Sequence, residues 1–259
     1  MVVRPAQPQF ANLSRDAVIA VNIDDPWVRR LAASFRGRQI SFGVNAEVGA
    51  RNVVDLGPDG VAFELVIGAH VAKIRLRLLG QHNVTNALAA AAMAHAMDLR
   101  LDAIAHGLEH AVGPAMRMQA IRLANGITLI NDAYNANPSS VEAALVALRR
   151  VSGRPVVVLG EMWELGDESG RAHYQVGERA ATLGVHALFL LGTQAAAVAA
   201  GARAGGMPAA AIHVCGSHAE VVDAVVASWQ PGDAVLVKGS RGMKMEDVVR
   251  LLEGAGKSP

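Results

Sequence analysis

The sequence predicts an α/β protein whose C-terminal half forms a doubly wound, mostly parallel sheet. Three observations support this fold class. Short apolar runs recur along the second half of the chain, most of them are bounded by glycine, and an amphipathic helical pattern separates each run from the next. Apolar strands that alternate with amphipathic helices are typical of parallel sheets with helices on both faces.

The first part of the chain has a different pattern, in which several strands precede a pair of helices. Asp25-Pro26 is expected to open a helix, because proline fits the first helical turn. The later apolar runs are separated by turn residues at 57–60 and at Gly68, which favours a meander. The helix at 83–97 is so rich in Ala, Leu and Met that we expect it to be buried on most sides. The expected strands are 17–21, 39–43, 51–56, 61–67 and 71–78, and the second helix of the pair is 101–112.

The pattern changes near Gly113-Pro114, which predicts two domains, 1–113 and 114–259. The first of them starts directly with a strand, so we expect it to lack an opening unit. In the second, Asn125-Gly126 between two apolar runs predicts a β-hairpin. The expected strands are 118–123, 127–130, 155–159, 187–191, 211–214 and 234–237. The expected helices begin at 138 or cover 169–183, 194–204, 218–229 and 244–252.

Composition excludes several classes of protein. Twenty-four basic and twenty-three acidic residues give a net charge of +1, which argues against a nucleic-acid partner. No apolar run approaches the roughly 18 residues of a membrane span, and the N-terminus lacks the apolar core of a signal peptide. The single cysteine, Cys215, excludes an internal disulfide framework. The expected protein is globular and cytoplasmic, without membrane insertion.

Polar clusters at the carboxyl ends of strands are the candidate sites, because doubly wound sheets bind ligands there. In residues 22–25, Asn22 and two aspartates follow a strand, and the simpler interpretation is a turn that caps the next helix. In residues 81–86, His82, Asn83 and Asn86 exceed the single polar residue that a cap needs. Amide side chains pair donors with acceptors and therefore suit a base edge, with capping alone as the alternative.

Two further clusters lie between a strand and a helix. Residues 131–138 hold three amides, a carboxylate and a phenol, which is more than helix capping requires. Residues 238–244 combine glycines with a hydroxyl and cations, which favours an anion site over a generic basic loop. Residues 160–166 also follow a strand, and their two acids either hold a cation or an amine or simply face water.

Three other signals are not accepted as sites. Residues 254–258 imitate the end of a phosphate-binding loop, but Leu251 stands where the first glycine is needed. No G-x-G-x-x-G follows the strand at 155–159, which weakens a nicotinamide-cofactor interpretation. The nine histidines lack ligand spacing, so no metal site is expected. Those on the expected helices, His95, His106 and His110, are interpreted as ordinary surface or core positions.

The clusters together resemble a known family. HNVTNALAAAA (82–92), NDAYNANPSSVEAAL (131–145), LGEMWELG (159–166) and VKGSRGMKMEDVV (237–249) resemble segments of the Mur ligases of peptidoglycan synthesis. The resemblance runs in consistent order from about residue 17 to 253. The Tyr-Asn-Ala-Asn and Lys-Gly-Ser-Arg runs are similar to those of the member that joins D-alanyl-D-alanine to UDP-N-acetylmuramoyl-tripeptide.

The resemblance implies a fold, an activity and a set of site residues. Residues 1–113 would be part of the P-loop-type central ATPase domain, and 114–259 the Rossmann-like C-terminal domain on the dipeptide side. The implied activity is ATP-dependent ligation through an acyl phosphate, with ATP and Mg as cofactors and the tripeptide precursor and D-alanyl-D-alanine as partners. The implied nucleotide contacts are Asn22, His82, Asn83 and Asn86 near the adenine, Arg117 at the phosphates and Asp132 at the ribose. The implied substrate-side residues are Tyr134, Asn135, Asn137, Glu161, Lys238, Ser240 and Arg241.

The sequence departs from the family pattern in several places. Met116 stands where a glycine often precedes the arginine, and Glu161 stands where aspartate is common. More importantly, the family's phosphate loop, magnesium-binding Glu and carbamylated Lys have no counterpart here, so no catalytic residue is assigned. We expect a ligase portion that needs this region for activity and is inactive alone. The alternatives are a non-catalytic binding or regulatory module and, less favoured, a Rossmann-type oxidoreductase.

Overall fold

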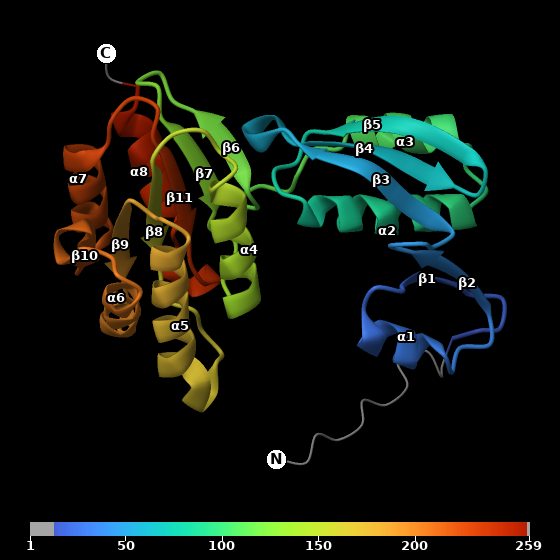
Figure 1. Ribbon diagram of the computed structural model, residues 1–259, viewed down its shortest axis with the longest axis horizontal. Helices are drawn as coiled ribbons and strands as arrows, with labels where there is room; N and C mark the ends of the chain where they lie inside the picture. Colours follow the sequence, from blue (N-terminus) through green and yellow to red (C-terminus); the bar gives the residue numbers. More distant parts are fainter. Residues whose placement is uncertain (1–12, 258–259) are drawn as a thin grey trace. The chain divides into compact units, whose positions relative to one another are not determined.

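The computed structural model describes residues 13–257, which form two compact units. The N-terminal unit contains the residues up to 112, except for 57–59 and 78–80. These two short segments belong with residues 113–257 in the C-terminal unit. Figure 1 shows the two units in the colours of the sequence. Across residues 13–257, no helix combines the length and the apolar character needed to cross a membrane.

The sheet of the N-terminal unit has the order β1-β2-β3-β4-β5. Its strands are β1 (Val18–Asn22), β2 (Arg38–Phe42), β3 (Val48–Asp55), β4 (Val61–Ile67) and β5 (His70–Leu76). β1 and β2 are parallel, whereas β3, β4 and β5 are antiparallel, which confirms the predicted meander. The helices are α1 (Pro26–Ala32), α2 (His82–Ala96) and α3 (Leu101–Glu109), and α3 ends earlier than expected.

Of the predictions for the helices of the N-terminal unit, the start of α1 is confirmed and the burial of α2 is not. Asp25 caps α1, because its side chain accepts hydrogen bonds from two first-turn amides and Pro26 follows it. The Ala-rich α2 packs against β1, β2, β3 and β4. The expectation that it is buried on most sides is wrong, because Met93 is 43% exposed and only one face of the helix is buried. The small alanines let that face approach the sheet closely, while the opposite face meets solvent.

The sheet of the C-terminal unit has the order β10-β9-β8-β11-β7-β6. Its strands are β6 (Gln119–Arg122), β7 (Thr128–Asp132), β8 (Pro155–Leu159), β9 (Ala187–Leu191), β10 (Ile212–Cys215) and β11 (Ala234–Lys238). All pairs are parallel except β6 and β7, which form the hairpin predicted at Asn125-Gly126. The helices are α4 (Pro138–Leu148), α5 (Ser169–Thr182), α6 (Ala195–Ala204), α7 (His218–Ser228) and α8 (Glu246–Ala255).

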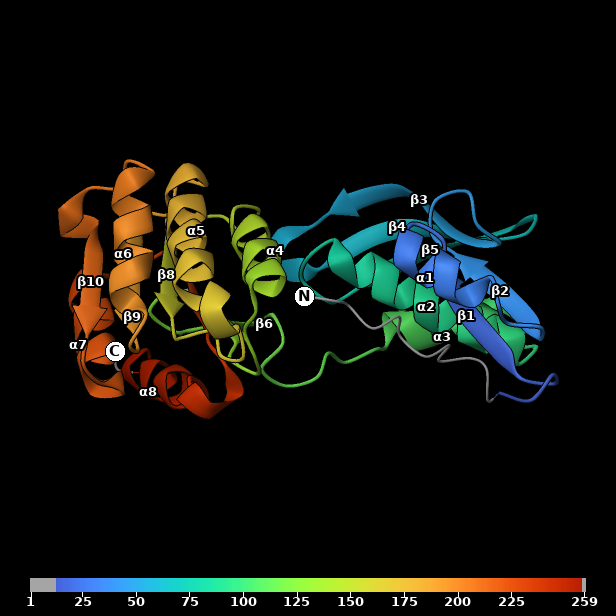
Figure 2. The ribbon, with the colours of Figure 1, turned by 90° about the horizontal axis from the view of Figure 1, so that it is seen from below.

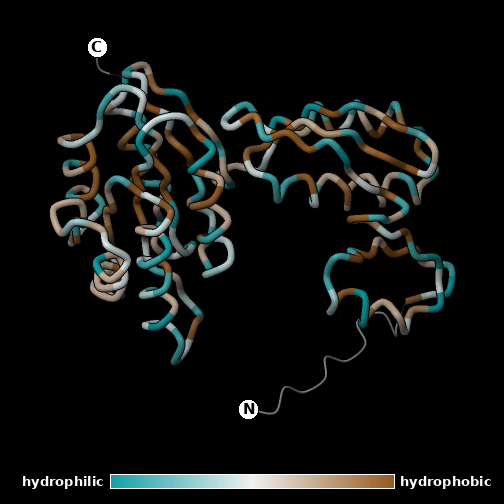
Figure 3. The backbone as a smooth tube through the Cα atoms, in the orientation of Figure 1, coloured by the Kyte–Doolittle hydropathy of each residue, from teal (hydrophilic) through white to brown (hydrophobic). Residues whose placement is uncertain are grey.

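Helices cover both faces of this sheet, which confirms the doubly wound fold. α4, α5 and α6 lie on one face, and α7 and α8 lie on the other (Figures 1 and 2). In β11, Leu236 belongs to the core on the α4–α6 side, whereas Val235 and Val237 belong to the core on the α7–α8 side. Because both faces of each central strand are buried, the strands have unbroken apolar sequences, visible as apolar segments at the centre of this unit (Figure 3).

The topology places β11 between β7 and β8, although it follows both in the sequence. The loops after β7, β8, β9 and β11 therefore meet at one edge of the sheet, which we call the carboxyl edge. The loop after β11 is longer than expected. Residues Arg241–Met243 form a short 3-10 turn, and Lys244 has a φ of +50°, so α8 begins at Glu246 instead of Lys244.

Candidate functional site

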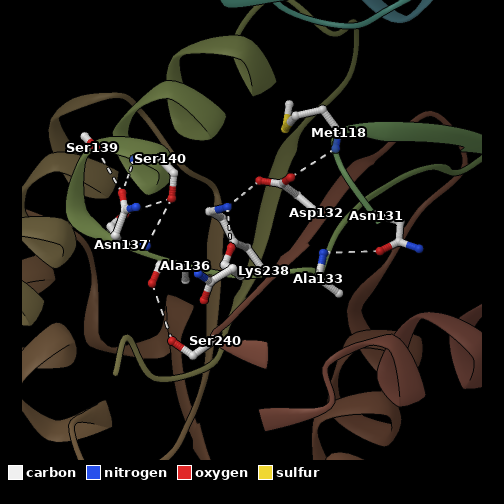
Figure 4. Close-up of polar contacts among 11 residues, drawn as sticks. Met118, Asn131, Asp132, Ala133, Ala136, Asn137, Ser139, Ser140, Lys238 and Ser240 are labelled. Carbon is white, nitrogen blue, oxygen red and sulfur yellow. Dashed lines mark hydrogen bonds and ion pairs between the residues drawn. The ribbon is translucent and has the colours of Figure 1, made fainter. Parts of the chain in front are cut away.

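A buried ion pair lies at the centre of the carboxyl edge. Lys238 and Asp132 are register partners at the ends of the parallel strands β11 and β7, so their side chains lie side by side. Lys238 Nζ lies 2.5 Å from Asp132 Oδ2 and donates a second hydrogen bond of 2.9 Å to the Asn135 carbonyl (Figure 4). Only 2% of Lys238 and 8% of Asp132 are exposed. Burial is tolerated because each charge has an opposite charge and additional hydrogen bonds.

The same aspartate also fixes the segment before β6. Asp132 Oδ1 accepts a 3.0 Å hydrogen bond from the Met118 amide, and Asn131 Oδ1 accepts one of 3.2 Å from the Ala133 amide (Figure 4). Both carboxylate oxygens of Asp132 therefore already accept a hydrogen bond from the protein. The family resemblance implies a ribose contact for this carboxylate, and the structure shows that it holds Met118 and Lys238.

Ser240 connects three of the loops at the carboxyl edge. Its hydroxyl accepts a 2.8 Å hydrogen bond from the Trp163 amide in the loop after β8, and it donates to the Ala136 carbonyl in the loop after β7 at 3.4 Å. Its own amide donates to the Glu161 carbonyl at 3.0 Å. Ser240 is 3% exposed, so these contacts hold it inside the protein. The loops can meet here because Gly239 faces Gly160, and a Cβ on Gly239 would lie 3.1 Å from the Gly160 Cα.

The two acids of the loop after β8 have different surroundings. Glu161 accepts hydrogen bonds from the Thr193 hydroxyl at 2.9 Å and from the Thr193 amide at 3.1 Å. It thereby ties this loop to the turn after β9. Glu164 is exposed and has a φ of +64°. Of the two alternatives that the sequence left open, the structure provides a protein partner for Glu161 and places Glu164 in solvent.

An arginine and a tyrosine stack at the surface of this edge. The Arg117 guanidinium carbon lies 4.3 Å from the centroid of the Tyr134 ring, a cation–π contact. Both side chains are exposed. The neighbours Met116 and Met118 have φ values of +62° and +49°, a region that favours glycine. This explains physically why a glycine suits the position of Met116, and it shows that the departure from the family pattern is accommodated with some backbone strain.

Other predicted substrate-side residues also have structural partners. Lys238 is buried in an ion pair with Asp132, so within residues 238–244, interpreted as an anion site, this cation already has a protein partner. Arg241 is exposed but pairs with Glu246 at 2.7 Å. Asn137 caps α4 in a reciprocal arrangement with Ser140, so helix capping alone is enough to explain an asparagine at this position. Asn135 is exposed, and its carbonyl accepts a hydrogen bond from Lys238.

The predicted adenine-side residues belong to the N-terminal unit. Asn22 ends β1, and its side chain accepts a hydrogen bond from the Asp24 amide, so the interpretation as a turn is confirmed for this cluster. His82 begins α2. Asn86 donates a 3.0 Å hydrogen bond to Asn83 one turn away, and the residue before the helix makes no side-chain cap. Gln81, the residue at the N-cap position, thus gives the capping alternative no support.

Sequence reasoning missed Thr193, Trp163 and His173. Trp163 packs on the loop after β11, where a Cβ on Gly242 would lie 1.9 Å from the indole ring. His173 lies on α5 and is 2% exposed. Trp163 lies within the quoted LGEMWELG segment but carried no assigned role, and Thr193 and His173 belong to none of the quoted segments. Their importance follows from the contacts that the folded loops make with one another. Among residues 13–257, no three His, Cys, Asp or Glu side chains form a group that could hold a metal ion.

A second ion pair lies at the opposite edge of the same sheet, where the parallel strands begin. The Arg154 guanidinium donates hydrogen bonds of 2.7 and 2.8 Å to the two oxygens of Asp233, which is 1% exposed. Burial by itself would raise the pKa of Asp233, but the hydrogen bonds from Arg154 and from the Gln230 amide outweigh it and lower that pKa. The pair ties the start of β8 to the segment before β11.

Two family models match the chain. The Mur ligase middle domain matches residues 9–94, and the glutamate ligase domain of Mur ligases matches residues 116–241. The doubly wound C-terminal unit and its polar carboxyl edge agree with this assignment. The chain belongs to the Mur ligase family.

Within that family, three similar proteins illustrate the likeness. UDP-N-acetylmuramoyl-tripeptide--D-alanyl-D-alanine ligase of Escherichia coli (strain K12) is 32% identical over 252 residues, which cover 95% of this chain and 54% of the relative. MurF from Acinetobacter baumannii is 31% identical with a TM-score of 0.84, over 92% of this chain and 52% of that structure. The MurF ligase of Thermotoga maritima, solved with ADP, shares the fold at 19% identity and a TM-score of 0.80, over 93% and 54%. The chain thus spans about half the length of the curated relatives it matches.

Proposed function

We propose that this chain supplies the nucleotide-side and dipeptide-side residues of a ligase that joins D-alanyl-D-alanine to UDP-N-acetylmuramoyl-tripeptide. The observation that carries the proposal is the likeness to ligases of that name along 95% of the chain, together with the organised polar edge at the corresponding C-terminal domain. In this proposal residues 1–113 are part of the ATP-binding domain, residues 114–259 are the dipeptide-side domain, and the reaction takes place in the cytoplasm.

The reaction proposed is an acyl transfer in two steps. The γ-phosphoryl group of ATP passes to the tripeptide carboxylate, and ADP leaves. The amine of D-alanyl-D-alanine then attacks the acyl carbon, phosphate leaves, and the amine loses a proton. The chain's own contribution is to bind and orient, with Arg117 as the exposed cation that can fork onto phosphate oxygens. No step is assigned to Mg, because the described residues contain no cluster of three or more His, Cys, Asp or Glu side chains that could hold a metal ion.

Binding and turnover can be tested separately. Titration calorimetry with ATP, ADP and D-alanyl-D-alanine on the 259-residue chain measures which ligands it holds. A coupled assay of phosphate release with the tripeptide precursor and the dipeptide then runs with and without the N-terminal half of the Escherichia coli relative, added as a separate polypeptide. The proposal expects dipeptide-dependent phosphate release in the mixture. Phosphate release that does not depend on the dipeptide would contradict the proposal. The absence of phosphate release in the mixture, despite ligand binding, would contradict it as well.

A non-catalytic binding module is the second candidate. The observation that favours it is that Asp132, Lys238 and Ser240 are buried and use their polar atoms on protein partners. Within the sequence that imitates the end of a phosphate loop, Gly254 lies in α8 and Gly256 ends that helix, so these glycines do not form a strand-to-helix loop. Ligand binding without turnover, with or without the added half, would support this candidate over the first.

A further inference from the structure

His173 occupies a buried position directly behind the loop after β8. Its Nε2 accepts a 2.9 Å hydrogen bond from the Met162 amide, and its Nδ1 lies 2.7 Å from the Ser169 carbonyl one turn earlier in α5. A carbonyl oxygen can only accept a hydrogen bond, so Nδ1 carries a proton. An amide N–H can only donate here, so Nε2 carries none. The two contacts therefore define a neutral imidazole with its proton on Nδ1.

The loop that His173 holds is also the loop that holds Ser240. Met162 is followed by Trp163, whose amide donates to the Ser240 hydroxyl at 2.8 Å. Glu161, on the other side of Met162, accepts from the Ser240 amide through its carbonyl. Three consecutive residues thus connect α5 to the loop after β11, and Ser240 continues the connection to the loop after β7 at Ala136.

We infer that His173 is a positioning residue for the substrate side of this edge. Its imidazole fixes the backbone at Met162, and through Trp163 and Ser240 it sets the shape of the loops after β11 and β7. It touches no ligand-facing atom, because it is 2% exposed and both ring nitrogens are occupied by the protein. The consequence for dipeptide binding rests on the proposed function, whereas the hydrogen-bond chain itself does not.

Two substitutions distinguish the hydrogen-bonding roles of the two ring nitrogens of His173. In His173→Gln the amide oxygen reaches the position of Nε2 and can still accept from the Met162 amide. In His173→Asn the amide nitrogen takes the position of Nδ1 and can still donate to the Ser169 carbonyl, but nothing accepts from Met162. His70→Asn, at an exposed position of β5, controls for the substitution itself.

Amide hydrogen exchange on the full chain is the first measurement. In His173→Asn we expect the amides of both Met162 and Trp163 to exchange at least about tenfold faster than in the parent, as loss of a net hydrogen bond implies. In His173→Gln and in His70→Asn both should stay within about threefold. Faster exchange at Met162 alone, or equal effects of Gln and Asn, would overturn the inference.

Nitrogen-15 NMR of the imidazole on the unaltered chain is the second measurement, and it does not depend on any variant folding. We expect a protonated Nδ1 and an unprotonated Nε2, and the opposite tautomer would overturn the inference. Calorimetry supplies the ligand readout. D-alanyl-D-alanine affinity should fall about tenfold in His173→Asn and be restored in His173→Gln, with ADP affinity unchanged in both. If the parent binds no dipeptide, the proposed function loses its support, while exchange and NMR still decide the role of His173.

Discussion

Removing the cation of the Lys238–Asp132 pair should destabilise the C-terminal unit more than substituting any exposed charged residue. In Lys238→Met the Asp132 carboxylate keeps its hydrogen bond from Met118 but loses its counter-charge. Breaking a buried pair on one side costs about 3–5 kcal/mol. The Asp132 side chain is 11% exposed, which allows some hydration, so we expect the lower end, about 3 kcal/mol. For a unit of this size that loss corresponds to a fall in Tm of roughly 6–12 °C.

A double-mutant cycle shows whether the loss belongs to the pair. Asp132→Asn keeps an oxygen that accepts from Met118, and Lys238→Met with Asp132→Asn leaves no charge without a partner. We therefore expect the double variant to cost clearly less than the sum of the single variants, with a coupling of about 2 kcal/mol. Lys257→Met, the same substitution at an exposed position, is the matched control and should stay within about 0.5 kcal/mol.

Urea unfolding measures these free energies in the unit that contains the pair. Trp27 belongs to the N-terminal unit and is 72% exposed, so replacing it with Phe leaves Trp163 and Trp229 to report on the C-terminal unit. A cost below about 1 kcal/mol for Lys238→Met, or single-variant costs that add within about 0.5 kcal/mol, would refute the reasoning. Either result would mean that the carboxyl edge does not depend on this ion pair.

Three further outcomes follow from named contacts. Under the proposed function, Arg117→Ala should lower ATP affinity about ten- to a hundredfold in calorimetry, as loss of a charge-assisted hydrogen bond implies, and an unchanged affinity would assign Arg117 to structure alone. Because the pKa of Asp233 is lowered in the folded state, its contribution to stability is complete above about pH 4 and disappears as the pH falls through the folded pKa. Asp233→Asn should therefore cost about 2–3 kcal/mol in urea unfolding at pH 7 and much less at pH 2.5, and a pH-independent cost would contradict the pairing with Arg154. Gly242→Ala should displace the half-exposed Trp163 ring, seen as a shifted indole N–H signal in NMR, with a stability loss of about 1 kcal/mol or less; an unshifted signal would show that the ring does not pack there.

The sequence predicted the strands of the C-terminal unit well because burial on both faces leaves an unbroken apolar run. It also located the polar clusters, since each follows a strand and parallel strands end at one edge. It failed on α2, where an Ala-rich composition suggested burial all round. Alanine is small enough to lie on either face, so its presence allows close packing on one side without excluding solvent on the other.

The partnership between Lys238 and Asp132 could not be predicted from local sequence. The two residues are 106 positions apart, and they become neighbours only because β11 inserts between β7 and β8. In sequence order, β7 and β8 would be the neighbouring strands, and Lys238 would remain a cation in a glycine-rich turn. A charged residue at the end of an apolar strand is thus ambiguous until the strand order is known.

The carboxyl edge divides its polar residues into two groups with different consequences for mutation. Asp132, Lys238 and Ser240 are buried and use their polar atoms to hold loops together, so substituting them changes the shape of the site before it changes any ligand contact. Arg117 and Tyr134 stay exposed beside them, stacked on one another, where a ligand can reach them. A loss of affinity in Asp132→Ala would therefore not identify a ribose contact, because the same change leaves Lys238 without its counter-charge. Only substitutions at the exposed residues, measured against unchanged stability, test ligand recognition directly.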